Sequence, residues 1–312
     1  YPPTVCTPCS TPLLPYPAPA LSAALPECRT LHAHRPGFAA GRMRLLKYIW
    51  KNTVLKCFNS KMAVFIILML VTSRSYLNPL REFSVAVNYP VSWCVFPFVM
   101  CSFTYLIIFW FGVIYVNSDV PFMQHVNMYH AIRVGRKCWA LGQIGGIFIR
   151  SVVLTVVAVI CTILPLLPDI EWSNEWGKLL RTAATTRALT QFDSSVFIYY
   201  EIFSEFSPLQ LIGLEILLCA CICTFIGVLM FLLSLFLNKI AAVAGGLALA
   251  IALFPVLNIH PMIRHKLAFF IPTIWAELAR IATPDYGYYW LPSIPYMLSL
   301  IHISEPTRPL YI

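Results

Sequence analysis

Residues 209–237 read LQLIGLEILLCACICTFIGVLMFLLSLFL, and Glu215 is the one charged residue among them. An α-helix needs about 20 consecutive apolar residues to cross the hydrocarbon core of a bilayer. The helix is required because backbone polar groups in lipid must find their hydrogen bonds within the segment. This stretch therefore predicts a transmembrane helix that has lipid as its main solvent.

Four more apolar runs surround this one, at residues 62–77, 91–116, 141–167 and 240–259. The first of them is short and has Arg74 near its end, where that side chain can extend to the surface. Only Asn238 and Lys239 separate the last two runs, which predicts a tight hairpin. A further apolar helix begins near Leu291. We therefore predict an all-α integral membrane protein with about five transmembrane helices and a truncated sixth.

Composition supports this class. Hydrophobic residues make up 59% of the chain and charged residues only 11%, whereas a soluble domain carries about 25% charged residues. Mean hydropathy is +0.75. Small residues, among them Gly142, Gly146, Gly245 and Gly246, are expected to let helices approach closely.

The net charge of +9 indicates lipid headgroups rather than nucleic acid as partners. The basic residues flank the apolar runs, as the positive-inside rule requires, and no aromatic-basic RNA motif accompanies them. Cysteines support neither a disulfide framework nor a metal site. Most lie inside apolar runs, and Cys6 and Cys9 form one isolated pair in a proline-rich tail.

The two ends differ from the apolar middle. Residues 1–42 begin without methionine and are rich in proline, so we expect a disordered tail. Two origins are open for it, a native extension or translation upstream of a true start at Met43. Residues 298–308, LSLIHISEPTR, resemble a translated transposon-end adapter, so we interpret 298–312 as a scar. The membrane domain is then 43–297.

Basic residues in the connections predict the orientation in the membrane. One side has nine of them against a single acid, and the other has eight against nine acids. We therefore place the native N-terminus in the cytoplasm of a multi-pass plasma-membrane protein. Lys239 is expected on the same side as Lys61 and Arg136, and Trp176 and Trp290 on the opposite side.

The loop 119–138 between the second and third runs has the pattern of an amphipathic helix. Ser118 or Asp119 can cap it, and Pro121 suits its first turn. Its apolar residues recur at helical spacing: Phe122, Val126, Tyr129 and Ile132. Its polar residues occupy other faces: His125, Asn127, His130, Arg133, Arg136 and Lys137. This pattern fits a cytoplasmic surface helix, either docked on a partner or lying alone on the membrane.

Taken together, the spans, the loop helix, the hairpin and a long outer segment before the last helix resemble the permease subunit of a bacterial ABC type-2 transporter. The stretch most similar to the coupling region of such permeases runs through Pro121, Tyr129, Arg133, Gly135, Arg136, Lys137 and Trp139. The likeness covers 43–297 and is mostly topological. It implies a dimer of permease subunits whose loop docks on a separate ATPase. The candidate coupling residues are Tyr129, Ile132, Arg133, Arg136 and Lys137.

Two charged residues lie inside apolar runs. An uncompensated charge at the bilayer centre costs roughly 2.5–3.5 kcal/mol on insertion scales, so Glu215 is a candidate intramembrane polar residue. A substrate or gating role competes there with protonation or with extension of the side chain to the surface. Arg150 is interpreted as an anchor at the inner boundary.

The outer segment 269–281 is interrupted by Pro272 and has one apolar face. Two interpretations are open for it. It forms either a short re-entrant or surface helix of the kind that the family places before its last span, or an amphipathic loop helix.

Motifs for catalysis are missing from the sequence. It has no G-x-x-x-x-G-K-S/T phosphate loop, no serine elbow motif and no H-E-x-x-H. We therefore predict no catalytic, cofactor-binding or metal-binding residues and no enzyme activity in this chain. The expected function is the permease subunit of an ATP-driven exporter. The alternatives are a membrane-embedded enzyme and a secondary transporter of unknown substrate.

Overall fold

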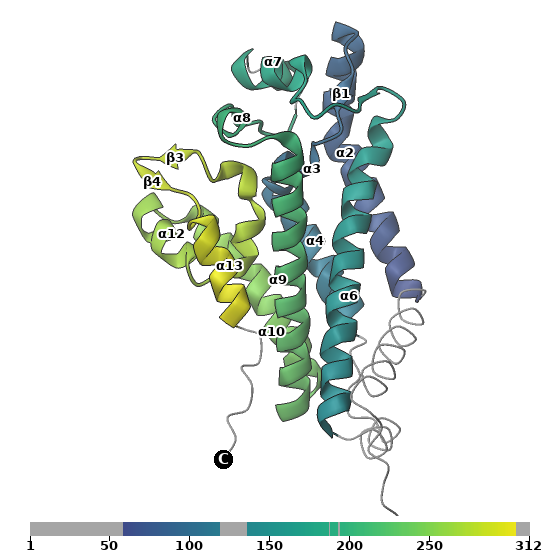
Figure 1. Cartoon of the computed structure of the whole chain (residues 1–312), viewed down its shortest axis with the longest axis vertical. Coiled ribbons are helices and arrows are strands. Elements are labelled where there is room, and N and C mark those ends of the chain that lie inside the picture. The colour runs from purple at the N-terminus through teal and green to yellow at the C-terminus, as the bar shows by residue number, and fades with distance from the viewer. Residues whose placement is uncertain (1–58, 119–135, 187, 193, 304–312) are drawn as a thin grey trace, which may run out of the picture.

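The computed structural model describes residues 59–118, 136–186, 188–192 and 194–303. Within this part the chain is helical, with two short two-stranded sheets. The long helices run side by side, and smaller elements gather at one end and along one flank (Figure 1). The predicted N-terminal tail, residues 304–312 of the predicted scar and most of the predicted loop helix, residues 119–135, lie outside the described residues.

The predicted fourth span is confirmed as α9 (Pro208–Phe236). Ser207 and Gln210 form a capping box at its start, in which each side chain bonds the other residue's backbone N–H. Pro208 follows as the first helical residue, where its missing N–H costs nothing. Helix α9 packs against α4, α6 and α10 and is the centre of the bundle.

The predicted third span is confirmed as α6 (Arg136–Ile163), which continues into the 3₁₀ turn η1 (Leu164–Leu166). It approaches α9 closely at Gly227, where an added Cβ would lie 2.5 Å from Ile147 Cγ2. The interpretation of Arg150 as a boundary anchor is wrong. That residue lies four turns into α6 and is only 4% exposed, because α9 covers its face of the helix.

The first span is longer than predicted. Helix α2 covers Ser60–Val87 and passes through Pro79, so Arg74 lies near its middle rather than at its end. The apolar face continues beyond Arg74 through Leu77, Leu80 and Phe83, which are buried against the bundle. This continued burial holds the helix together past the charged residue.

The second run does not form the continuous span that was predicted. It begins with the strand β1 (Val91–Ser92) and is then divided into α3 (Phe96–Met100) and α4 (Phe103–Asn117). The break falls at Cys101 and at Ser102, whose extended backbone caps α4 and whose Oγ donates to the Ser195 carbonyl at 2.9 Å. Hydrogen bonds from other segments thus replace those that a continuous helix would make.

The fifth span is α10 (Lys239–Ile251), extended by α11 (Leu253–Asn258). Asn238 caps α10 by accepting a hydrogen bond from the Ala241 N–H at 2.7 Å, which explains the tight hairpin after α9. The predicted start of a sixth helix corresponds to α13 (Ile294–Ile303). Helix α13 continues into the first residues of the predicted scar.

Small elements cover the end of the bundle opposite the α9–α10 hairpin (Figure 1). Strand β2 (Ile170–Glu171) pairs in parallel with β1. It is followed by α7 (Lys178–Thr186), η2 (Ala188–Phe192) and α8 (Ile202–Glu205). Buried Trp176 donates to the carbonyl of Phe206, the residue that ends α8 just before α9, at 2.8 Å.

Between α11 and α13 the chain forms a separate unit along the flank of α9 (Figure 1). It consists of α12 (Pro261–Ala268), η3 (Pro272–Ala276), η4 (Leu278–Arg280), and the hairpin β3 (Pro284–Asp285) and β4 (Tyr288–Tyr289). Left-handed Tyr286 and Gly287 make the turn of that hairpin, with φ of 51° and 82°. Such values favour glycine at the second position.

Residues 272–280, named here the buried segment, lie against the bundle. Every side chain from 272 to 279 is buried. Trp110 of α4 donates to the Thr273 carbonyl, and the Thr273 hydroxyl donates to the Leu249 carbonyl of α10, both at 3.2 Å. An amphipathic loop helix is therefore excluded, because the segment has no solvent-facing side over these residues.

Four helices in the described part are long and apolar enough to cross a membrane: α2, α6, α9 and the continuous stretch of α10 and α11 up to Val256. Helix α4 is apolar but has only 15 residues, so the expectation of five long helices is corrected to four and a shorter one. Large apolar side chains face outward, for example Ile67 and Val71 of α2 at 61% and 62% exposed. The chain is an all-α protein of the membrane class.

Candidate functional site: a buried charged cluster beside α9

Glu215 is the predicted site residue whose side chain the structure places. It is 0% exposed, so extension of its side chain to the surface is excluded. Its Oε1 accepts a hydrogen bond from the Cys219 thiol at 3.4 Å, and its carboxyl group lies against the backbone N–H of Leu278. Oε2 has no hydrogen-bond partner in the described part of the chain. The carboxyl group thus faces the buried segment.

The predicted coupling residues are placed less completely. Tyr129, Ile132 and Arg133 lie outside the described residues. Arg136 and Lys137 form the first turn of α6. Their role as a docking surface stays a prediction.

A second buried carboxylate, Glu277, joins η3 to η4 and is 0% exposed. Arg280 lies one turn further along, with its Nη1 3.0 Å from Glu277 Oε2. Trp290 Nε1 donates to the same oxygen at 2.8 Å. Charge-assisted hydrogen bonds of this kind are about twice as strong as neutral ones, so this carboxylate fixes both the arginine and the indole.

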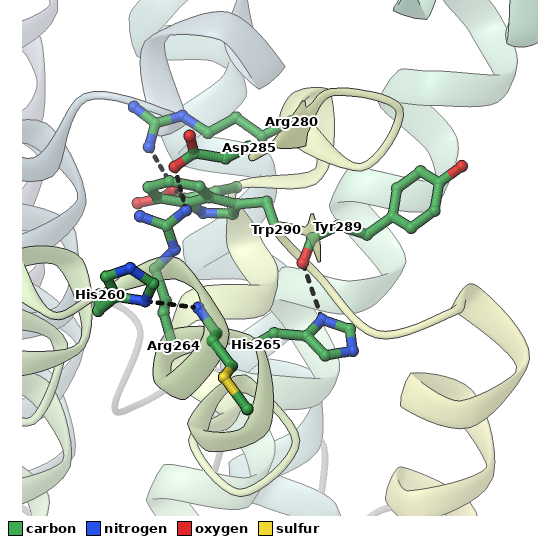
Figure 2. Close-up of polar contacts among 9 residues, drawn as sticks. His260, Arg264, His265, Arg280, Asp285, Tyr289 and Trp290 are labelled. Atoms are coloured by element: carbon green, nitrogen blue, oxygen red, sulfur yellow. Dashed lines mark hydrogen bonds and ion pairs between the residues drawn. The ribbon is translucent and has the colours of Figure 1, made fainter. Parts of the chain in front are cut away.

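Trp290 also stacks with two guanidinium groups. The guanidinium carbon of Arg264 lies 3.5 Å from the centre of the indole, and that of Arg280 lies 4.6 Å away. Figure 2 shows the indole between them. Arg264 is paired in turn with Asp285 of β3. Cation–π contacts of desolvated arginine reach about 2 kcal/mol, so this stack stabilises the attachment of α12 and the β3–β4 hairpin.

Arg280 links this cluster to the break in the second run. Its Nη2 donates to the Cys101 carbonyl at 2.8 Å, where the helix is interrupted between α3 and α4. A carbonyl group freed from helical bonding is costly to bury without a partner. Arg280 therefore gives the Cys101 carbonyl a hydrogen-bond donor at the break between α3 and α4. This bond joins the break to the buried segment, which is far away in sequence.

Histidines occupy the edge of the cluster. His265 Nδ1 lies 2.8 Å from the Tyr289 carbonyl of β4, and His260 caps α12 through a contact with the Met262 N–H at 3.4 Å (Figure 2). Both contacts position backbone. Within the described ranges, no group of three or more His, Cys, Asp or Glu residues is arranged to hold a metal ion.

Burial raises the pKa of Glu277 to about 7. Desolvation of the carboxylate is the main cause, and the Arg280 charge and the Trp290 hydrogen bond oppose it. The group therefore changes charge near neutral pH. Perturbed carboxylates of this kind concentrate at functional sites, although structural ion pairs show the same behaviour.

Most of this cluster was missed from the sequence. Glu277 and Arg280 are spaced for an ion pair on one turn, inside the otherwise apolar stretch 271–281, and that spacing was the available signal. Arg264 and Trp290 carried no signal, because their contacts depend on the folding of the β3–β4 hairpin against α12.

Comparison with protein-family models, curated proteins and solved structures finds no match to the chain. The fold and the cluster therefore define a class, a helical membrane protein with a buried charged network outside its long helices. The permease resemblance continues to rest on topology alone.

Proposed function

We propose that the chain is the membrane-spanning permease subunit of an ATP-driven exporter, energised by a separate cytoplasmic ATPase. The main support is the buried segment between α11 and α13. It packs against α9 and α10 and precedes α13, which is compatible with the short segment that the resemblance places before the last span. The α9–α10 hairpin, closed by the Asn238 cap, is a second point of agreement.

The arrangement of the ends is compatible with this proposal. Helices α6 and α10 begin at the same end of the bundle, with Arg136 and Lys239 at their starts (Figure 1). Lys61, near the start of α2, donates to Ser118 Oγ at the end of α4 at 2.7 Å. The described residues that flank 119–135, Ser118 and Arg136, therefore lie at this basic end, which a cytosolic partner would reach.

A secondary transporter is the second candidate. Buried acidic residues inside a membrane bundle mark ion pathways in many transporters, and Glu215 and Glu277 are two such residues. A secondary transporter needs no ATPase, so the two candidates differ in their partner.

Replacing Tyr129 and Ile132 together with aspartate is expected to abolish co-purification of the separate ATPase subunit that this proposal requires. The two charges would interrupt the apolar stripe of the loop, while the membrane helices remain unchanged. Recovery of the ATPase with tagged wild-type and doubly substituted permease, extracted in the same detergent, measures the effect. A matched control places the same two aspartates on the polar face, at His125 and Asn127.

If the wild type and the Tyr129, Ile132 double variant recover the ATPase equally, and transport is undiminished, the loop has no coupling role. Loss of recovery from the control as well would show that the loop is sensitive to any added charge, and the stripe would then have no special part. Transport that continues without any ATPase would favour the secondary transporter.

A further inference from the structure

The charges around Glu215 do not balance. Of the two fully buried carboxylates in the described residues, Glu277 has Arg280 beside it, whereas no cation is within pairing distance of Glu215. Arg264, the other cation of the cluster, is paired with Asp285. The region therefore carries one uncompensated negative charge when all its acids are ionised.

The segments packed near Glu215 bring mainly acids and thiols to it. The η4 turn contributes Glu277 and Arg280, and the α3 region contributes the thiols of Cys94 and Cys101. Helix α9 itself contributes the Cys219 thiol. The described part of α4 has no charged side chain, and in α10 only Lys239 is charged, at its far end.

Helix α6 carries Arg136 and Lys137 in its first turn and Arg150 further along, and Arg150 lies at a different level of the bundle from Glu215. Residues near Arg150 contact α9 close to Cys223 and Gly227. Eight residues of α-helix separate Cys223 from Glu215, which corresponds to about 12 Å along the axis. Arg150 therefore does not neutralise Glu215.

An isolated carboxylate that is removed from water is unstable and takes up a proton instead. We propose that Glu215 binds one exchangeable proton on Oε2, the oxygen that has no partner in the described structure. A proton fits better than a metal ion. The described chain offers no group of three acidic, histidine or cysteine residues arranged to hold a metal ion.

The bound proton has a structural consequence. Glu215 lies against Leu278, the residue after Glu277, so loss of the proton would put a second negative charge beside an existing one. Two like charges in a medium of low polarity repel strongly. The protonated form therefore keeps the buried segment in contact with α9, whether or not the chain is part of an exporter.

The infrared C=O stretch of protonated carboxylic acids tests this proposal on the full chain in lipid nanodiscs, at about pH 8.5, where ordinary carboxyl groups are ionised. The deuterium-sensitive band of a protonated acid is expected in the wild type and lost in Glu215→Gln. It should persist in Glu277→Gln and in Glu205→Gln, a replacement of an exposed acid.

Absence of the band from the wild type would overturn the proposal even if Glu215→Gln failed to fold. Retention of the full band in a folded Glu215→Gln variant would also overturn it, as would loss of the band in Glu277→Gln alone. Loss restricted to Glu215→Gln, with the band returning in a variant that carries aspartate at this position, supports the proton site.

Discussion

Replacing Glu277 with alanine is expected to destabilise the folded bundle by about 3–5 kcal/mol, because it leaves a buried guanidinium without its counter-ion. Arg280 would keep the Cys101 carbonyl as a partner but lose the carboxylate at 3.0 Å, and the Trp290 indole would lose its acceptor. Thermal or denaturant unfolding in detergent measures the loss. Glu205→Ala, at an exposed acid of α8, should change stability by no more than about 0.5 kcal/mol.

The pH dependence of unfolding gives a second readout for Glu277. Its pKa is about 7 in the folded chain, against an ordinary value of 4.5. Between these values the folded chain holds a proton that the unfolded chain has released, so this contribution to stability is lost as pH rises through 7. The wild type should melt at a lower temperature at about pH 8 than at about pH 5.5. A Glu277→Gln variant with the same pH dependence would contradict the buried location of Glu277.

Substituting leucine for Gly227 is expected to cost about 2–3 kcal/mol, as overpacking of a tight core does. A Cβ at this position would lie 2.5 Å from Ile147 Cγ2 and 3.5 Å from the Asn117 amide. Helices α6 and α9 would have to separate, and lipid supplies no hydrophobic force that would restore their contact. Unfolding in detergent, compared with the wild type, measures the effect.

Gly213 provides the matched control, because it lies on the exposed side of the same helix and a Cβ there meets nothing within 4 Å. Leucine at Gly213 should be neutral or stabilise by up to about 1 kcal/mol through helix propensity. Equal effects of the two substitutions would show that α6 and α9 are not in close contact. Partial recovery in a Gly227→Ala, Ile147→Ala double variant would confirm which side chain is displaced.

The membrane class and most of the helices were predictable, because few structures other than a membrane-spanning helix accommodate a long apolar run. Runs 141–167 and 209–237 correspond closely to α6 with η1 and to α9. The first run was predicted too short, since Arg74 was interpreted as a boundary whereas burial of Leu77 and Leu80 continues the helix. The division of the second run depends on partners at Ser195 and Arg280, which local sequence does not reveal.

Of the candidate site residues named from the sequence, Glu215 is the one that the structure places beside the charged cluster. An acid in a long apolar run is visible in the sequence, but whether its side chain is buried or extends to the surface depends on which residues cover it. The buried segment, about 60 residues later in the chain, covers Glu215. The Glu215 side chain therefore does not reach the surface. Glu277 was not singled out because Pro272 and the apolar residues around it suggested only a short helix. Its partners come from separate parts of the chain: Arg280 from η4, Arg264 from α12 and Trp290 from the residue after β4.

Cysteine accessibility in intact cells tests most directly whether this bundle crosses a membrane with its basic end inside. Suitable positions are Trp172 at the α7 end, 69% exposed, and Ile240 at the α9–α10 hairpin, 80% exposed. Each would be introduced as a single cysteine after replacement of the native cysteines. A membrane-impermeant maleimide should label position 172 in intact cells and position 240 only after permeabilisation. Labelling of position 240 with protection of 172 would reverse the orientation and place the loop 119–138 beyond the reach of a cytosolic ATPase.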